Sequence, residues 1–152
     1  MSPARLRAYR EPDLPALADL WVAAWNTTGF IVDFAARREW LENHLRKLAA
    51  AGVRIVVAVG AQEAPVGFVS IDPESGYLDQ LCVAPDAFGT GVARMLVREA
   101  MRLSPGLVDL DVNEGNGRAR RFYEREGFRF VTRGLSALSG LPTIRMRWEA
   151  VA

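Results

Sequence analysis

The chain has 152 residues, of which 50% are hydrophobic and 24% charged, and its formal net charge is +1. This composition is typical of one folded domain, spanning residues 1–152, and excludes disorder as the dominant state. No apolar run approaches the roughly 20 residues that cross a bilayer, and the N-terminus is charged, so we expect a cytoplasmic protein with no membrane partner. One cysteine, Cys82, excludes an internal disulfide, and with a single histidine, His44, we expect no metal site.

The first third of the chain predicts a short strand followed by two helices. Residues Arg5–Arg10 form the predicted strand, and Asp13 is placed to cap the first helix. One face of that helix is apolar and should pack against the core; it holds Leu14, Leu17, Ala18, Trp21, Ala24 and Trp25.

A second helix is predicted from Phe34 to about Ala51, with Asp33 as its cap and Gly52 just after its end. Within this helix Trp40, His44 and Leu48 are spaced by four residues and therefore share one side. We expect His44 to lie on the helix surface, where it is a candidate base.

β-Branched residues predict the strands in the middle of the chain. Val53–Val59 and Val66–Ile71 flank a segment with Gly60 and Pro65, a pattern typical of a hairpin. A third strand follows at Tyr77–Val83. Strict alternation would place Tyr77, Asp79, Leu81 and Val83 on one face of it, and Leu78, Gln80 and Cys82 on the other.

The second half of the chain alternates helices and strands. The predicted elements are a helix at Gly91–Leu103, a strand at Leu107–Val112, a helix at Arg118–Glu126, and strands at Phe128–Thr132 and Thr143–Trp148. A strand–helix–strand order requires a crossover and so at least one parallel pair, whereas hairpins pair antiparallel. We expect an α/β (α+β) fold with a mixed, mostly antiparallel sheet of six or seven strands and about four helices on both faces.

A glycine-containing loop within Val83–Arg94 joins a predicted strand to a predicted helix. Free backbone N–H groups at a helix N-terminus suit phosphate or pyrophosphate, and glycine lets the ligand approach the backbone. The charge distribution agrees, because residues 86–152 hold eleven basic and eight acidic side chains while residues 1–85 hold eight and ten. No Lys/Arg run resembles a nucleic-acid patch, so we expect no nucleic-acid partner.

Two nucleotide-binding fingerprints compete for this loop. A P-loop requires a Gly-Lys-Ser/Thr ending, which is absent. A dinucleotide-binding fingerprint would begin at Gly89, with Asp109 or Asp111 as the acidic residue about 20 positions on. Against it, Arg94 stands where the third glycine belongs, and the chain is short for a six-stranded fold.

Two sequence blocks stand out on either side of the crossover. The first reads Leu-Asp-Gln-Leu-Cys-Val-Ala-Pro from Leu78 and Phe-Gly-Thr-Gly-Val-Ala from Phe88. The second reads Asn-Gly-Arg-Ala-Arg-Arg-Phe-Tyr-Glu-Arg-Glu-Gly-Phe from Asn116. In order and spacing they resemble the acetyl-CoA loop and the Asn-x-x-Ala-x-x-Phe-Tyr-Glu segment of the GCN5-related N-acetyltransferase (GNAT) family. The resemblance covers essentially the whole chain and implies a single GNAT-like domain with a central pair of splayed parallel strands.

What the resemblance implies for the cofactor is acetyl-CoA, used as a co-substrate without a metal. The pantetheine arm would lie along Leu81 and Val83, with the pyrophosphate on residues 89–94. One position departs from the family pattern, because Phe88 stands where Gln or Arg is usual, but the backbone donors remain and we expect binding to survive. The implied cofactor-binding residues are Leu81, Cys82, Val83, Phe88, Gly89, Thr90, Gly91, Val92, Ala93, Arg94, Asn116 and Tyr123.

The resemblance also implies direct transfer of an acetyl group to a primary amine. Tyr123 matches the tyrosine that protonates the departing thiolate. Asp111 matches an acidic residue of the ribosomal-protein N-terminal acetyltransferases, and Asp79 an acid of smaller relatives; if their strands are neighbours, these carboxylates could take the amine proton near the thioester. Cys82 suggests an acetyl-cysteine intermediate, but its predicted face is covered by helices, so we expect a buried hydrophobic residue instead.

The acceptor is predicted to bind between the first two helices and the loop before the last strand, where family folds place acceptor-binding groups. We expect Trp25, Thr27, Phe30 and Tyr77 to contact it. The few charges there favour a small or amphipathic amine, and a peptide amine stays open. A CoA-binding sensor that kept the fold and lost the chemistry is the alternative from another class, and Phe88 favours it. A different acyl group and a homodimer are also compatible with the sequence.

Overall fold

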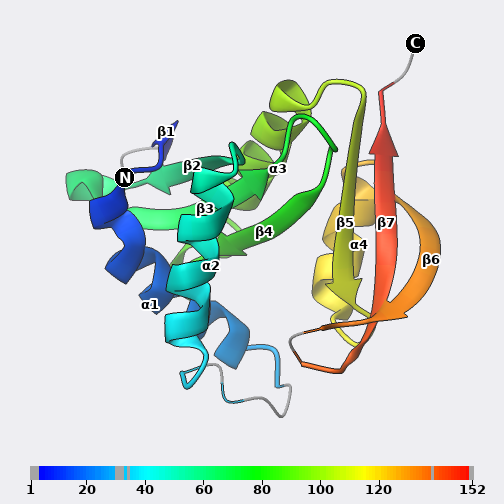
Figure 1. Cartoon of the computed structure of the whole chain (residues 1–152), viewed down its shortest axis with the longest axis horizontal. Coiled ribbons are helices and arrows are strands. Elements are labelled where there is room, and N and C mark those ends of the chain that lie inside the picture. The colour runs from blue at the N-terminus through cyan, green and yellow to red at the C-terminus, as the bar shows by residue number, and fades with distance from the viewer. Residues whose placement is uncertain (1–3, 30–32, 34, 138, 151–152) are drawn as a thin grey trace.

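The computed structural model describes residues 4–29, 33, 35–137 and 139–150. Its strands and helices follow the predicted order and confirm an α+β protein (Figure 1). The elements are β1 (Arg5–Ala8), α1 (Leu14–Asn26), α2 (Arg38–Ala50), β2 (Arg54–Val59), β3 (Pro65–Ile71), β4 (Leu78–Val83), α3 (Val92–Leu103), β5 (Leu107–Asn113), α4 (Gly117–Arg125), β6 (Arg129–Leu135) and β7 (Pro142–Glu149).

The strands form two antiparallel sheets that meet at one point. The first sheet has the order β1-β2-β3-β4 and the second the order β5-β7-β6. The predicted parallel pair, β4 and β5, is reduced to an isolated bridge between Tyr77 and Asp109, where the Asp109 N–H donates to the Gly76 carbonyl at 2.8 Å. Beyond this junction the two strands diverge, which confirms the splayed pair (Figure 1).

Two hydrophobic clusters hold the layers together. On one face of the first sheet, α1 and α2 bury Leu17, Trp21 and Leu41 against residues such as Phe68 of β3. On the other face, α3 and α4 pack with both sheets, and Leu96 is fully buried there. Figure 1 shows α1 and α2 on the near side of the first sheet and α3 on its far side. Helices therefore cover both faces, as predicted.

The second helix begins later than predicted. Its first residue is Arg38, whereas the sequence pattern started it at Phe34, which lies outside the described residues. The Asp33 carboxylate does act locally, because its Oδ1 accepts a hydrogen bond from the Ala36 N–H at 3.0 Å. That bond stabilises a turn before the helix, a known alternative use of a capping side chain.

The predicted faces of β4 are wrong at its start, because the strand contains a β-bulge. Ser70 of β3 pairs with Gln80, but the next residue, Ile71, pairs with Leu78, so Asp79 is the extra residue. The bulge moves Leu78 into the same cluster as Val83, although strict alternation put them on opposite faces. Asp79 is thereby turned away from Leu81 and Val83.

No helix in the described ranges is both long enough and apolar enough to span a bilayer.

Candidate active site

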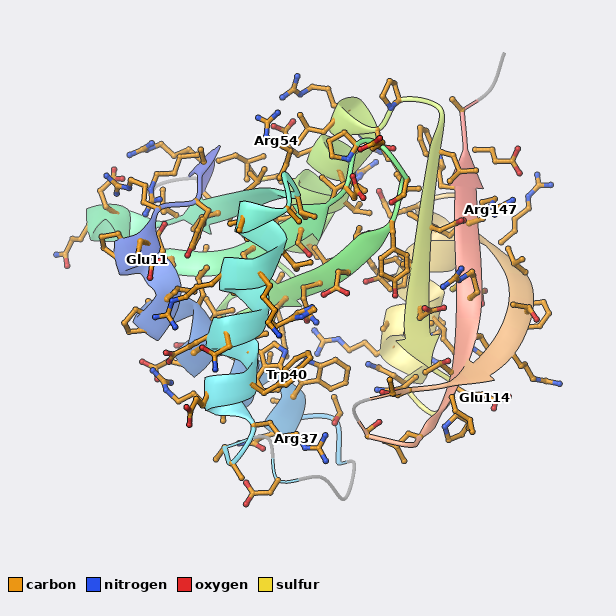
Figure 2. The ribbon with its side chains drawn as sticks, viewed as in Figure 1. Glu11, Arg37, Trp40, Arg54, Glu114 and Arg147 are labelled. Carbon is orange, nitrogen blue, oxygen red and sulfur yellow. The ribbon has the colours of Figure 1, made fainter. Side chains whose placement is uncertain are left out.

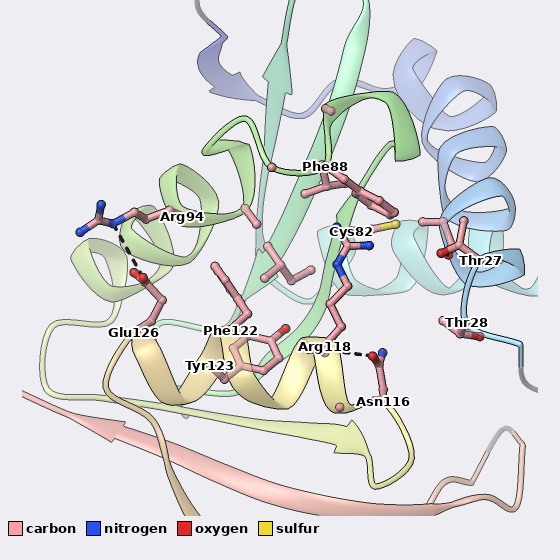
Figure 3. A pocket seen from close by; sticks show the side chains of 18 of the residues that line it. Thr27, Thr28, Cys82, Phe88, Arg94, Asn116, Arg118, Phe122, Tyr123 and Glu126 are labelled. Carbon is pink, nitrogen blue, oxygen red and sulfur yellow. Dashed lines mark hydrogen bonds and ion pairs between the residues drawn. The ribbon is translucent and has the colours of Figure 1, made fainter.

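A cavity of about 870 Å³ opens where β4 and β5 diverge (Figure 3). Its walls come from the end of α1, the last residues of β4, the loop before α3 and one side of α4. This volume lies within the range of small-molecule and cofactor sites. Predicted site residues that line it are Trp25, Thr27, Leu81, Cys82, Val83, Phe88, Gly89, Gly91, Ala93, Arg94, Asn116 and Tyr123.

The N-terminus of α3 supplies free backbone donors to the cavity. Gly91, the N-cap, has φ of +91° and Gly89 has φ of +77°, and a Cβ at either position would meet no atom within 4 Å. The glycines are therefore required by backbone conformation, and the space beside them is open. The first helical N–H with a backbone partner is that of Met95, which donates to Gly91. The preceding donors face an empty site suited to an anion.

The outer edge of β4 supplies a second row of backbone groups. The Ala84 N–H donates to Val66 and the Gln80 N–H to the Ser70 hydroxyl, so the even-numbered residues turn toward β3. Backbone groups alternate along a strand, and those of Leu81 and Val83 therefore point to the open edge beside β5. An extended ligand with amide groups could pair there as an added strand.

Helix α4 carries Asn116 and Tyr123 to the same cavity. The Asn116 side chain caps the helix by accepting the Ala119 N–H at 3.2 Å. Tyr123 is 8% exposed, and its ring contacts those of Phe122 and Phe128 edge-on. Figure 3 shows its hydroxyl pointing toward the cavity. Burial raises the pKa of Tyr123, so the phenol stays protonated across the neutral range.

Arg118 is a cavity residue that the sequence analysis missed as a site candidate. Its guanidinium lies 3.8 Å from the centre of the Phe88 ring, a cation–π contact that holds both side chains (Figure 3). Arg94 and Arg125 line the same cavity, and Arg94 lies 3.7 Å from Glu126. The basic residues of the second half therefore gather around the free donors of α3. The available signal was the position of Arg118 inside the second motif.

Three of the predicted cofactor-binding side chains are turned away from the open space or buried. Val92 packs into the core, and the Thr90 hydroxyl donates to the Ala87 carbonyl. Cys82 is buried against α1, with its Sγ 3.9 Å from the Leu20 carbonyl, and burial raises the pKa of its thiol. A neutral, buried thiol is a poor nucleophile, which agrees with the expected hydrophobic role.

The two predicted catalytic carboxylates lie in separate interactions outside the cavity lining. Asp79 Oδ2 lies 2.6 Å from His44 Nε2 of α2. Asp111 instead receives two hydrogen bonds from Arg145, at 3.0 and 2.9 Å, and one from the Tyr77 hydroxyl at 2.8 Å. The expected cluster of carboxylates is therefore absent from the described residues.

The surroundings of Asp111 fix its charge. Burial raises the pKa of the Asp111 carboxyl, but the hydrogen bonds from Arg145 and Tyr77 outweigh it, and the pKa is lowered overall. Burial and the bond to Asp111 also raise the pKa of Tyr77. All the oxygen atoms of this cluster are thus engaged, and Asp111 is a weak base.

The predicted acceptor-binding residues are only partly brought together. Trp25 and Thr27 line the cavity at the end of α1, whereas Tyr77 is bound to Asp111 away from it. Phe30 lies outside the described residues. Within the described chain, no group of three or more His, Cys, Asp or Glu side chains could hold a metal ion.

A helix N-terminus with free donors beside a diverging strand and a buried phenol defines a site for an acyl-carrying cofactor with phosphate groups. Residues 14–128 match the model of the acetyltransferase (GNAT) family. The chain belongs to this family, and it is an N-acetyltransferase.

Curated relatives and solved structures agree with this membership. Peptidyl-lysine N-acetyltransferase YjaB of Escherichia coli is 31% identical over 128 residues, 84% of either chain. YjaB of Salmonella typhimurium is 43% identical over 77 residues, so the matched part spans about half of that relative. The solution structure of apo-form YjaB from E. coli superposes with a TM-score of 0.77 at 28% identity, covering 98% of this chain and 99% of that one.

The fold also matches a structure solved with a cofactor. PaiA N-acetyltransferase from Thermoplasma acidophilum, in complex with coenzyme A, has a TM-score of 0.80 at 17% identity and covers 97% of this chain and 99% of that one.

Proposed function

We propose that this protein transfers the acetyl group of acetyl-CoA to a primary amine, by direct attack within a ternary complex. The observation that carries the proposal is the single cavity that collects the free N–H groups of α3, the open edge of β4 and the Tyr123 hydroxyl. Each matches one part of the reaction: phosphate binding, alignment of the acyl arm and protonation of the leaving group.

In this proposal the cofactor spans the cavity from α3 to the junction of the sheets. The pyrophosphate rests on the backbone of residues 89–94, with Arg118 beside it. The pantetheine amides pair with Leu81 and Val83, and Asn116 contacts the same arm from α4. The coenzyme A complex of PaiA, a protein of the same fold, supports this assignment.

Tyr123 is proposed to assist departure of the thiolate. As the carbon–sulfur bond breaks, negative charge develops on sulfur, and a neutral phenol donates a hydrogen bond and then a proton to it. The raised pKa of Tyr123 keeps that proton available at neutral pH. Cys82, by contrast, is buried and uncharged, which supports direct transfer over an acetyl-cysteine intermediate.

A lysine side chain of a peptide is the acceptor that the relatives favour. Both YjaB relatives are named peptidyl-lysine N-acetyltransferases. A long, flexible amine would enter from the side of Trp25 and Thr27, at the end of α1. A small-molecule amine is the second candidate, supported by the apolar side chains that line the cavity.

The alternative function is a CoA-binding sensor without chemistry. The substitution at Phe88 favours it, because a polar contact to the cofactor is lost there. Two measurements separate the functions: thermal unfolding with acetyl-CoA, and release of free thiol across a panel of lysine peptides and small amines. Stabilisation with thiol release supports the enzyme, stabilisation without release supports the sensor, and no stabilisation contradicts both.

The variant Tyr123→Phe tests the proton donor. We expect kcat to fall by about 10²-fold or more, because the loss of a general acid typically costs 10²–10⁴-fold. The dissociation constant of acetyl-CoA should stay within about twofold, since the ring and its packing are kept. Equal kcat values for the variant and the wild type, measured by thiol release, would exclude the role of Tyr123.

A further inference from the structure

A second polar pair lies beside the cavity and has no part in cofactor binding. His44 projects from α2, and its Nε2 lies 2.6 Å from Oδ2 of Asp79 at the bulge of β4. The side chains are 25% and 23% exposed, so water and a small group reach them. Figure 2 shows Trp40 projecting from the same helix. Its ring stacks on that of His44, with centroids 4.6 Å apart and planes 14° from parallel.

This arrangement fixes the tautomer and the plane of the imidazole. An ionised carboxylate only accepts hydrogen bonds, so Asp79 holds the proton of His44 on Nε2 and leaves Nδ1 as an acceptor. The Gln80 amide also donates to Asp79 Oδ2, at 3.3 Å, which anchors the carboxylate. Stacking on Trp40 restricts rotation of the ring. The group is therefore oriented before any substrate binds.

The pair lies where the acyl end of the cofactor should arrive. The two sheets are closed at the bridge between Tyr77 and Asp109, and the cavity reaches along β4 as far as Leu81. Asp79 lies between these points, on the bulge. A cofactor that enters from α3 and follows the edge of β4 thus ends beside Asp79, on the side from which α2 presents His44.

The other candidate base is less suitable. Asp111 is engaged by Arg145 and Tyr77, and its pKa is lowered overall. His44, in contrast, has no recorded partner on Nδ1 among the described residues, and Asp79 is the charged group that contacts it. A neutral imidazole accepts protons in the neutral pH range, which suits a general base.

We propose that His44 is the general base of the acetyl transfer and that Asp79 is its positioning residue; this inference rests on the function proposed above. The substrate ammonium loses one proton to Nδ1 of His44, directly or through one water. The amine nitrogen then bonds to the thioester carbonyl carbon, and the carbon–sulfur bond breaks. Sulfur takes the proton of the Tyr123 hydroxyl, and the second proton leaving nitrogen returns to that oxygen through solvent.

The products are an amide, free thiol and a His44 imidazolium, which releases its proton to solvent. Two neighbours stabilise this cation while it exists. The Asp79 carboxylate is its counter-charge, and the face of the Trp40 indole attracts a stacked cation. The same three side chains therefore orient the base and stabilise its charged form.

The variant His44→Gln tests the base, with Lys47→Gln as the control on the same helix. Glutamine retains a donor for Asp79 but accepts no proton at neutral pH, and Lys47 is exposed one turn away. We expect kcat for a lysine peptide to fall by about 10²-fold or more in His44→Gln, with the acetyl-CoA dissociation constant unchanged. The control should keep the wild-type kcat.

The pH profile separates a base from a structural residue. The wild-type profile of kcat/KM should fall on the acid side as the base is protonated, and His44→Gln should lack that limb. In His44→Ala, added imidazole should restore activity in proportion to its neutral form. In Asp79→Asn, kcat should fall while the KM of acetyl-CoA stays constant. Failure of the protein to acetylate any amine would overturn the proposed function, whereas a His44→Gln enzyme with wild-type kcat and acid limb would overturn this inference alone.

Discussion

At the scale of single residues, Phe88 shows how the site tolerates a departure from the family pattern. The side chain at this position usually offers a polar group, but here it offers a ring on which Arg118 stacks at 3.8 Å. The stack positions a guanidinium at the cavity, and a guanidinium binds phosphate well. The lost contact is thereby replaced by a charge from a different element.

The variant Phe88→Ala measures this replacement. A cation–π contact is worth about 0.5–1 kcal/mol at a partly exposed site, so acetyl-CoA should bind about two- to fivefold more weakly by isothermal titration calorimetry. Phe130→Ala is a matched control, because Arg133 lies 5.9 Å from that ring and neither residue lines the cavity. Unchanged affinity in Phe88→Ala would mean that Arg118 needs no support.

Residue-level predictions succeeded where a motif fixes a local position. Asn116 and Tyr123 lie on one helix, and helical spacing alone brings both to the cavity. The contact between His44 and Asp79 joins positions 35 residues apart and depends on how α2 packs on the first sheet. No spacing in the sequence encodes that distance, so the pair became visible only in the structure.

At the scale of elements, the start of α3 places the conformational demand on two glycines. Gly91 is left-handed and caps the helix, although a Cβ there would touch nothing. The variant Gly91→Ala should therefore lose about 1 kcal/mol of unfolding free energy from backbone strain alone. It should also weaken acetyl-CoA binding, because the backbone donors shift.

Gly106→Ala provides the comparison for Gly91→Ala. A Cβ at Gly106 also meets no atom within 4 Å, and its φ lies outside the left-handed region. Urea denaturation should show unchanged or slightly increased stability for this variant. Equal losses in both variants would show that strain at position 91 is not the cause.

Element boundaries were harder to predict than element types. The apolar spacing of α2 gave its core residues correctly, but the Asp33 side chain stabilises a turn and the helix starts at Arg38. The bulge at Asp79 could not be predicted, since one inserted residue leaves the apolar composition of β4 unchanged. Its consequence is large, because it turns a carboxylate toward α2.

At the scale of the whole molecule, the two sheets depend on a narrow junction at Gly76. This residue has φ of +80°, and a Cβ there would lie 2.7 Å from the Leu107 carbonyl oxygen. Its own carbonyl accepts the Asp109 N–H that joins the sheets. The cavity opens from this junction, so its geometry sets the angle of the site.

The variant Gly76→Ala should destabilise the protein by more than the strain of a left-handed alanine, about 1–2 kcal/mol. Gly52→Ala is the control, because Gly52 has φ of +89° and open space around its Cβ. The difference between the two, measured by urea denaturation, reports the contact with Leu107. If both variants lose the same stability, the junction tolerates the methyl group.

The overall architecture was predictable because its signals are cumulative. The alternation of strands and helices and the two motifs together define the fold, and no single boundary error changes it. A division into two sheets joined by one bridge was not visible as such, because strand propensity does not reveal which neighbours lose their pairing.

The division into two sheets also sets an order of folding. Strands β2, β3 and β4 pair with their neighbours along the chain, so the first sheet closes only short loops. Strand β5 must wait for β7, which pairs with it across α4 and β6. Since loop closure slows with sequence separation, the N-terminal sheet should assemble early and the catalytic cleft last. During synthesis, acetyl-CoA thus meets a complete binding site only after the final strand has been made.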